Sequence, residues 1–347
     1  MRNEIQVGLI GAGANSKRHH IPKLQAIGGV GIVGVCNRSR QSGDQVADEF
    51  SIPQVYNDWV EMVNDDAIDA IVIGTWPYMH CPATCGALEA GKHVMTEARM
   101  AMNAAEAHQM LKASLARPDL VAQIVPSPMT LRFDRTIRRL LDEGYIGDLR
   151  VVDIDGSAGA FPDPQATMSW RQDAGLSGLN IMSMGIWYEA MARWVGHAAK
   201  VSATTQVFTD TRKDQEGNAR RIEVPDHVDI LAELPGGARA HLRFSDTTAF
   251  SPACDTAHIY GSDGVLKLDL NVNELFGARR GDDSMSKIPI PDTEAQDWRV
   301  EEEFVGAIRG QEQIRLTTFE EGVWYMEFTE AVSRSAKSGQ AVTLPLD

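Results

Sequence analysis

A glycine-rich stretch near the start of the chain has the residue types and the spacing that bind a nucleotide pyrophosphate. Gly11-Ala12-Gly13-Ala14-Asn15-Ser16 directly follows an apolar run. Gly11 permits a tight turn, Gly13 lets the backbone approach the pyrophosphate, and the small Ser16 stands where a third glycine is common. The helix expected after the turn offers unpaired N–H groups to the anion. The loop predicts a dinucleotide site with Gly11, Gly13, Ala14, Asn15 and Ser16; the alternative is a glycine-rich turn without a ligand.

The end of the second expected strand discriminates between dinucleotides. An NAD site places a carboxylate there to bind the ribose hydroxyls. This chain instead reads Cys36-Asn37-Arg38-Ser39. No carboxylate repels a 2′-phosphate, and the guanidinium of Arg38 can bind one through two hydrogen bonds. The sequence favours NADP over NAD, with Asn37, Arg38 and Ser39 at the cofactor; alternatively, Arg38 stacks on the adenine or lies in solvent.

Short apolar runs alternate with helical patterns in residues 1–126. Continuous apolar runs are typical of parallel strands that are covered on both faces. Right-handed crossovers through the intervening helices then predict an α/β fold, a doubly wound Rossmann sheet. The expected strands are Ile5–Ile10, Gly31–Cys36, Asp69–Ile73, His93–Thr96 and Leu120–Val125.

The pattern changes after Pro126-Ser127-Pro128. Two hairpin signals follow, Val228–Leu234 with Ala238–Phe244 and Ala257–Tyr260 with Val265–Leu270. Helices are expected over Phe133–Glu143, Gly185–Val195 and Phe319–Lys337. These elements predict an α+β domain with a mostly antiparallel sheet that faces solvent on one side. We expect a dinucleotide-binding domain over 1–126 and a substrate-binding and oligomerisation domain over 127–347.

Composition and charge exclude several classes of protein. The 347 residues include 48 acidic and 33 basic ones, a formal net charge of −15 that argues against a nucleic-acid partner. The chain contains no apolar run long enough for a membrane span and its start has no secretory signal, so we expect a cytoplasmic protein without a membrane partner. The four cysteines are expected to be buried packing thiols, and no metal site is expected.

Three further segments complete a family resemblance. They are Gly74-Thr75-Trp76-Pro77-Tyr78-Met79-His80, Ala90-Gly91-Lys92-His93-Val94-Met95-Thr96-Glu97 and Leu141-Asp142-Glu143-Gly144-Tyr145-Ile146-Gly147. With the glycine-rich loop they resemble the glucose–fructose oxidoreductase/inositol dehydrogenase/MocA family. The resemblance implies a nicotinamide cofactor bound also by Thr75, Trp76, Pro77, His80 and Glu97. It further implies a small polar substrate such as a sugar or cyclitol, and a homodimer or homotetramer.

The chain departs from that family where the family carries its chemistry. Members usually read Glu-Lys-Pro after the fifth strand, whereas this chain reads Glu97-Ala98-Arg99. In the second domain the resemblance places Ser183 and Trp187 where members usually carry an Asp and a His or Tyr. Since Ala98, Ser183 and Trp187 cannot act as general bases, the proton must be transferred by another residue.

The polar residues near these positions supply the candidates. Tyr188 and His80 are the candidate proton-transfer residues, with Arg99 holding a carboxylate or polarising a carbonyl. We assign the substrate site to Arg171, Asn180, Trp187 and Glu189. Each has a structural alternative: Tyr188 is a core aromatic, His80 packs on its loop, Glu189 is solvated or ion-paired, Asn180 caps a helix, and Arg171 pairs with Asp163 or Asp173.

Three functions are consistent with these residues. The favoured one is an NAD(P)-dependent oxidoreductase that transfers a hydride between the nicotinamide and a sugar, cyclitol or related hydroxy or keto compound. The second is a lyase that keeps its nucleotide tightly bound and uses transient oxidation to assist elimination. The third is a non-catalytic sensor of NAD(P) or of a sugar. Fold analogy does not choose among them.

Overall fold

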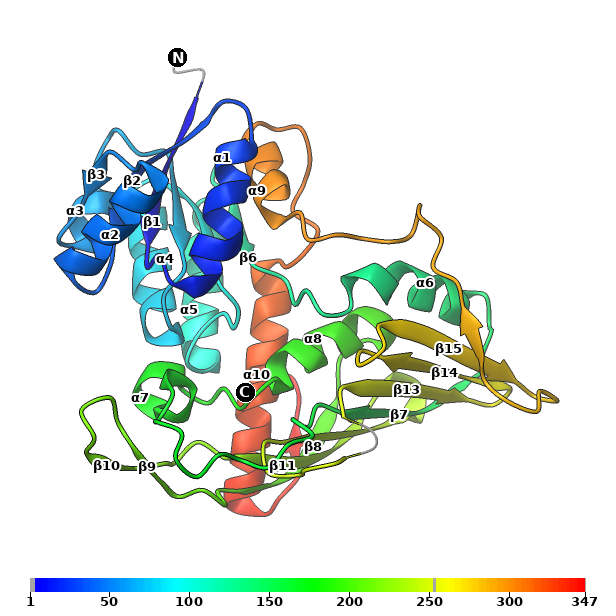
Figure 1. Cartoon of the computed structure of the whole chain (residues 1–347). Coiled ribbons are helices and arrows are strands. Elements are labelled where there is room, and N and C mark those ends of the chain that lie inside the picture. Colours follow the sequence, from blue (N-terminus) through cyan, green and yellow to red (C-terminus); the bar gives the residue numbers. More distant parts are fainter. Residues whose placement is uncertain (1–3, 252–253, 347) are drawn as a thin grey trace. The chain divides into compact units, whose positions relative to one another are not determined.

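The computed structural model describes residues 4–251 and 254–346. The chain forms two compact units, and each is built from two separate segments of the sequence (Figure 1). The first unit runs to Pro126 and also contains Arg299–Val323, and the second contains Ser127–Trp298 and the chain from Trp324 onward. The segment Arg299–Val323, expected in the second domain, thus belongs with the dinucleotide-binding one. The long helix α10, Phe319–Ser338, extends from one unit into the other.

The first unit is built on a parallel six-stranded sheet in the order β3-β2-β1-β4-β5-β6. This order confirms the predicted doubly wound Rossmann sheet, with the strand order reversing between β1 and β4. Apolar residues fill its centre, and Val7, Ile71 and Val94 are fully buried. Its strands are β1 (Ile5–Ile10), β2 (Val30–Cys36), β3 (Gln54–Val55), β4 (Ala70–Ile73), β5 (His93–Thr96) and β6 (Ala122–Ile124).

Some helices of this unit begin at residues that the sequence favours for capping. Asn103 accepts a hydrogen bond from the backbone N–H of Glu106 and caps α5, as predicted, and Ser39 caps α2 in the same way. A π-helical turn, Ser16–His20, joins the glycine-rich loop to α1. The helices are α1 (Ile21–Ala26), α2 (Arg40–Phe50), α3 (Trp59–Val63), α4 (His80–Glu89), α5 (Ala104–Leu115) and α9 (Val300–Ile308).

The returning segment closes the β6 edge of the sheet. Ile124 and Thr317 exchange backbone hydrogen bonds of 3.0 and 3.1 Å. The buried side chain of Gln123 donates to the carbonyl of Leu316 at 2.7 Å. The backbone N–H groups of Arg315 and Leu316 in turn donate to the buried carboxylate of Glu303 on α9. These contacts satisfy an edge strand that would otherwise expose its backbone groups.

The second unit contains a nine-stranded, mostly antiparallel sheet in the order β16-β15-β14-β13-β7-β12-β11-β8-β17, which confirms the predicted α+β class. Both predicted hairpins form, as β11–β12 and β13–β14. The strands are β7 (Leu149–Asp155), β8 (Lys200–Gln206), β11 (His227–Glu233), β12 (Arg239–Ser245), β13 (Thr256–Gly261), β14 (Gly264–Asp269), β15 (Glu274–Arg279), β16 (Ser286–Ile288) and β17 (Val342–Thr343), beside a separate hairpin of β9 (Thr211–Lys213) and β10 (Ala219–Arg221).

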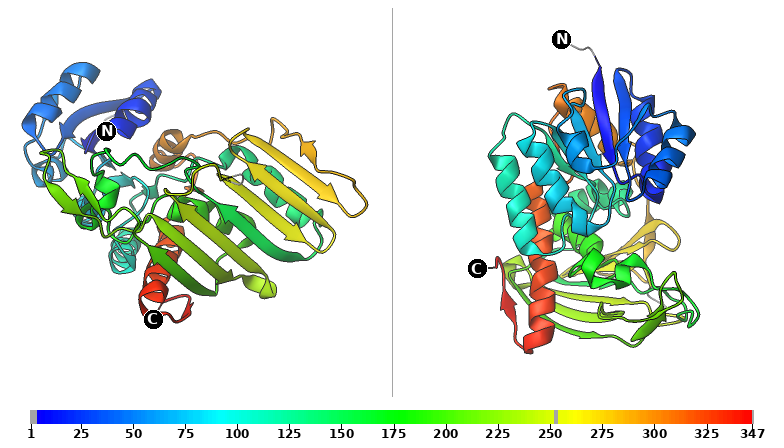
Figure 2. Two further views of the ribbon diagram at one scale, coloured as in Figure 1. Left: turned by 60° about the horizontal axis from the view of Figure 1, so that its bottom comes forward. Right: turned by 90° about the vertical axis from the view of Figure 1, so that its left-hand side faces the viewer.

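Helices α6 (Leu131–Asp142) and α8 (Met184–Val195) lie over one face of this sheet, and α7 (Ala174–Ser177) is a single short turn (Figure 1). The opposite face is open to view in Figure 2, left. Burial alternates along β11 and β12, as a sheet with one solvent-facing side requires. Among the described residues, none of the helices is both long enough and apolar enough to cross a bilayer.

Candidate functional site: the carboxyl end of the parallel sheet

The glycine-rich loop passes so close to the neighbouring strand that only glycine fits at its first position. Gly11 has a φ of +82°, and a Cβ atom there would lie 2.8 Å from the backbone nitrogen of Thr75. Gly74 faces it from the end of β4, and a Cβ there would lie 2.5 Å from the carbonyl oxygen of Gly11. Gly13 is exposed and has no such crowding, which leaves its backbone accessible. At the ends of β1 and β4 the main chains of Gly11 and Gly74 therefore lie close together without side chains between them, and we call this surface the floor of bare backbone.

A cavity of about 290 Å³ opens above this floor. Its position at the switch point of the strand order is where doubly wound sheets bind nucleotides. The lining combines backbone of the glycine-rich loop with polar and aromatic side chains from the ends of β2 and β4. The lining residues are Gly11, Ala12, Gly13, Asn37, Arg38, Ser42, Gly74, Thr75, Trp76 and Tyr78. The sequence predictions for Gly11, Gly13, Asn37, Arg38, Thr75 and Trp76 coincide with this cavity.

Asn37 and Arg38 have different roles at the end of β2. The side-chain oxygen of Asn37 accepts a hydrogen bond from the N–H of Ala12 at 2.7 Å and so holds the loop. The guanidinium of Arg38, which is exposed, lies 5.2 Å from the centroid of the Trp76 ring. Ser39 caps α2, and its hydroxyl donates to the Ser42 hydroxyl at 3.0 Å. The Arg38 guanidinium and the Ser42 hydroxyl thus line the cavity where a ribose would be expected, and Ser39 contacts Ser42.

His80 is placed to hold the loop after β4 rather than to exchange protons with a ligand. Its ring is fully buried, with Nδ1 2.9 Å from the carbonyl oxygen of Arg99 and Nε2 3.1 Å from that of Thr75. Burial lowers the pKa of His80, which favours the neutral ring, and a neutral ring can donate to only one of these carbonyls. The neighbouring Pro77 is also buried. These contacts match the structural alternative for His80.

Glu97 and Asn15 are joined at the sheet edge. The side-chain amide of Asn15 donates to Oε1 of Glu97, and Nε2 of His20 lies 2.8 Å from the same oxygen. The second carboxylate oxygen accepts from the N–H of Ala98 at 3.2 Å. Burial is the largest influence and would raise the pKa of Glu97, but the hydrogen bond and charge of His20, together with the Asn15 hydrogen bond, hold the pKa below its usual value. Arg99 follows with only 7% of its surface exposed.

Most of the second-unit candidates lie in the interior of their unit. Tyr188 is 1% exposed, stacks on Phe328 at 3.6 Å between ring centroids, and its hydroxyl accepts from the N–H of Ala198 at 3.0 Å. Burial raises the pKa of Tyr188. Asn180 is 1% exposed and its amide donates to the carbonyl of Ser177 at 2.7 Å. The surroundings of Tyr188 are those of a core aromatic and do not support the proton transfer expected of it.

Glu189 belongs to a buried ion-pair network. Its carboxylate accepts from the backbone N–H of Ser127 at 3.1 Å and from the guanidinium of Arg193 at 2.8 Å. Arg193 also donates to Asp134 at 2.8 Å and to the Thr130 hydroxyl at 3.0 Å. The three charged side chains are between 6% and 11% exposed. These contacts correct the substrate-binding assignment of Glu189, because its oxygens already serve the interior of the unit.

Two other residues of this unit retain access to solvent. Arg171 lies 4.4 Å above the Trp170 ring and is exposed, and its electrostatic partner is Asp246 rather than the expected Asp163 or Asp173. Asp255 is half-buried and carries a φ of +48°, and its carboxylate faces the indole N–H of the fully buried Trp187. Burial, together with the charge of Asp155, raises the pKa of Asp255. Sequence reasoning missed Asp255, which lies in no recognisable motif.

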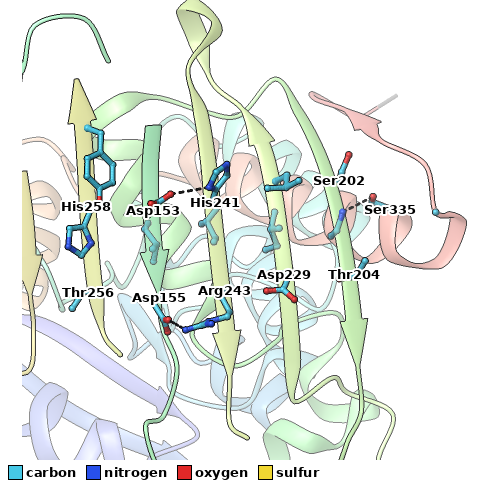
Figure 3. Close-up of a pocket in the computed structure, with 17 residues that line it drawn as sticks. Asp153, Asp155, Ser202, Thr204, Asp229, His241, Arg243, Thr256, His258 and Ser335 are labelled. Carbon is cyan, nitrogen blue, oxygen red and sulfur yellow. Dashed lines mark hydrogen bonds and ion pairs between the residues drawn. The ribbon is translucent and has the colours of Figure 1, made fainter. Parts of the chain in front are cut away.

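The open face of the nine-stranded sheet carries a second, wider hollow of about 770 Å³ (Figure 3). His241 lies 3.1 Å from Asp153, and Arg243 pairs with Asp155 across the neighbouring strands. Leu231 is 58% exposed beside them. The described part of the chain holds no cluster of His, Cys, Asp and Glu suited to a metal ion. The hollow therefore combines charged side chains that pair with one another and apolar ones such as Leu231.

With the geometry described, comparison with known proteins identifies the family. Residues 5–122 match the model of the GFO/IDH/MocA oxidoreductase family with its NAD-binding Rossmann fold, and residues 135–267 match the model of the family's C-terminal domain. The chain belongs to this oxidoreductase family. It carries the family's NAD-binding domain, as the glycine-rich loop predicted.

The curated relatives include dehydrogenases. Trans-1,2-dihydrobenzene-1,2-diol dehydrogenase from Mus musculus is 26% identical over 237 residues, which is 68% of this chain and 66% of that protein. The enzyme of the same name from Homo sapiens is 25% identical over 270 residues, 76% of this chain and 72% of that protein. The chain thus matches about two thirds of the length of these relatives.

Solved structures share the fold over nearly the whole chain. An oxidoreductase domain protein from Kribbella flavida superposes with a TM-score of 0.83 at 21% identity, covering 99% of this chain and 100% of that one. Levoglucosan dehydrogenase in complex with NADH and levoglucosan also gives 0.83, at 19% identity and with the same coverage of both chains.

Proposed function

We propose that the chain binds NAD(P) above Gly11 and Gly74 and oxidises or reduces a carbinol carbon of a sugar, cyclitol or related small hydroxy or keto compound. The observation that carries this proposal is the floor of bare backbone at the strand-order switch, where a Cβ at either glycine would collide with main-chain atoms. Backbone N–H groups there can hold a pyrophosphate. The names of the diol and levoglucosan dehydrogenases support the substrate class.

The chemistry divides between cofactor and protein. When bound, the nicotinamide accepts or donates the hydride at the carbinol carbon. The protein has to orient the substrate and to take up the hydroxyl proton, or to return it in the reverse direction. Ala98, Ser183 and Trp187 have no side chain that can do so. The hydroxyl of Tyr188 and both ring nitrogens of His80 lie within hydrogen-bonding distance of backbone groups inside the fold.

We propose that NADP is preferred over NAD. The guanidinium of Arg38 and the hydroxyl of Ser42, which accepts from Ser39, line the cavity, and Asn37 stands where an NAD site carries a carboxylate. Arg38→Ala should weaken NADP binding about 10- to 100-fold and NAD binding much less, since charge-assisted bonds to the 2′-phosphate are lost. Arg40→Ala is the matched control, because Arg40 is engaged by Asp44 at 2.8 Å. Equal weakening of both nucleotides by Arg38→Ala would contradict the preference.

The decisive experiment is calorimetric titration with NADPH and NADH, followed by turnover assays with a panel of polyols and sugars. Net formation or consumption of reduced nucleotide supports the oxidoreductase. Turnover without net change in the nucleotide would indicate the lyase, and binding without turnover would indicate a sensor. No affinity for either dinucleotide would overturn the proposal.

We also propose a cytoplasmic homodimer or homotetramer that associates through the open face of the nine-stranded sheet. Acidic and basic groups alternate across this face, as in Asp153 with His241, so a second copy related by a two-fold axis offers complementary charges (Figure 3). The free thiols fit a reducing compartment. Leu231→Asp should shift the light-scattering mass to that of the monomer; an unchanged mass would exclude this face.

A further inference from the structure

One histidine of the nucleotide-binding unit lies between two carboxylates that are far apart in the sequence. His20, at the end of the π-helical turn, is fully buried. Its Nδ1 is 2.6 Å from Oε1 of Glu301 on α9, a residue 281 positions away. Its Nε2 is 2.8 Å from Oε1 of Glu97, which follows β5. Both ring nitrogens therefore face carboxylate oxygens.

This arrangement requires a protonated ring. Carboxylates only accept hydrogen bonds, so two of them are satisfied together only when both ring nitrogens carry a proton. Burial alone would lower the pKa of His20, but the hydrogen bonds to Glu301 and Glu97 outweigh it and raise the pKa to about 9. The same contacts hold the pKa values of Glu97 and Glu301 below normal.

The remaining charged and titratable groups around the cluster are accounted for. Lys23 on α1 lies 3.6 Å from Glu301 and balances the second negative charge. His80 on α4 faces Glu97, and burial keeps the pKa of His80 low. The cluster is thus a buried imidazolium with two carboxylates and one ammonium, close to neutral as a whole. Buried charges are tolerated when they are paired in this way.

The cluster reaches the ligand side of the sheet through Glu97. This side chain is 15% exposed, whereas those of His20 and Glu301 are fully buried. Its Oε1 also accepts from the amide of Asn15 in the glycine-rich loop. In a doubly wound sheet, the ends of the strands beyond the switch point flank the second half of a dinucleotide. Glu97 therefore links the pyrophosphate loop to the region expected for the nicotinamide half.

We propose that His20 and Glu301 are positioning residues for the dinucleotide: the imidazolium of His20, held by Glu301 of the returning segment, fixes Glu97 and Asn15 in the arrangement that receives the nicotinamide half. This role rests on the proposed function. It assigns a part in cofactor binding to α9, which is far from the glycine-rich loop in sequence.

The inference gives dinucleotide affinity a characteristic pH dependence. The folded-state pKa of His20 is raised from 6.5 to about 9, so the ring stays protonated and the cluster stays intact through the neutral range. It is lost as the pH rises through about 9, because the neutral ring can donate to only one carboxylate. Dinucleotide affinity should therefore be constant around neutral pH and should weaken as the pH rises through about 9.

The test compares three variants by calorimetric titration with NADPH and NADH. His20→Gln and Glu301→Gln should each weaken binding about tenfold at neutral pH and abolish the alkaline decline. His108→Gln, which changes an exposed histidine on α5 of the same unit, should match the wild type in affinity and pH profile. Binding within twofold of the wild type in both cluster variants, with the alkaline decline retained, would overturn the role of His20.

A measurement on the wild type keeps the inference testable if the variants fold poorly. Nitrogen-15 NMR of the histidine rings should show both nitrogens of His20 protonated at neutral pH, with deprotonation near pH 9. Deprotonation at or below the ordinary value of 6.5 would overturn the inference. A wild type that binds neither dinucleotide would instead overturn the proposed function itself, whatever the NMR result.

Discussion

The two sheets of this protein use opposite parts of their surface. The six-stranded parallel sheet buries apolar residues at its centre, so ligand-facing groups are confined to its carboxyl edge. The nine-stranded sheet has helices over one face, and its other face presents charged side chains and Leu231. Strand direction and coverage therefore decide whether the exposed groups of a sheet lie along its edge or across one of its faces.

The units also differ in how they use buried charge. In the first unit the His20 cluster ends in Glu97, which is partly exposed at the ligand edge. In the second unit Arg193 joins Asp134 and Glu189 entirely within the interior. Similar chemistry thus reaches a partly exposed edge in one unit and stays in the core of the other, and single substitutions can separate the two arrangements.

The largest effect is expected at the interior network of the second unit. Arg193→Met should lower the free energy of unfolding by about 3–5 kcal/mol, because two buried carboxylates lose their cation. Arg334→Met, which removes a surface pair with Glu330, is the control and should cost less than about 0.5 kcal/mol. Urea unfolding measures both. A small effect at Arg193 would make Glu189 available for another role.

The next largest effect is expected at the ligand edge of the parallel sheet. Gly11→Ala should raise the Kd for dinucleotide about 100-fold, because the residue has a φ of +82° and its Cβ would collide with Thr75. Gly28→Ala is the matched control, since no atom lies within 4 Å of its added Cβ. Calorimetric titration compares them. Equal affinities would mean that the cavity is not the pyrophosphate site.

A smaller, purely structural effect is expected for Tyr188. Tyr188→Phe should lower the free energy of unfolding by about 1–3 kcal/mol, since the buried N–H of Ala198 loses its acceptor. Its kcat should stay within about twofold of the wild type, because a group outside the proton-transfer path leaves the rate unchanged. Thermal unfolding and steady-state kinetics measure the two quantities. A large fall in kcat at unchanged stability would restore Tyr188 as the proton-transfer residue.

The smallest effect is expected at Trp76. Trp76→Leu removes the ring beneath the Arg38 guanidinium and should weaken NADP binding about two- to fivefold. NAD binding should change less, because the main loss is the orientation of Arg38 toward the 2′-phosphate. Competition titration with both nucleotides gives the ratio. An equal loss for both would indicate that Trp76 contacts the shared part of the ligand.

The sequence predicts the first unit well because its signals are local. The glycine-rich loop, the apolar strands and the Asn103 cap each act within a few residues, and the structure places them as expected. The family resemblance extended this reading to the fold of the second unit. Local patterns also located the two hairpins of the nine-stranded sheet.

Long-range contacts could not be predicted in the same way. Arg299–Val323 carries helical and loop patterns that do not reveal which sheet edge it covers. Likewise, Glu189 stands in the sequence as an isolated acidic residue, and its partners Ser127 and Arg193 become evident only in the packed structure. The resemblance pointed to residues 183–189 of the second unit, but packing decides which side chains there remain reachable.

The backbone pairing between Ile124 and Thr317 affects how the protein is made. A ribosome releases the first six strands long before the segment that completes their outermost edge. Until about residue 317 has emerged, the nascent Rossmann layer carries an uncapped strand and lacks the carboxylate that Glu301 contributes. The nucleotide domain should therefore mature late in translation, and a fragment ending at Pro126 should be prone to self-association.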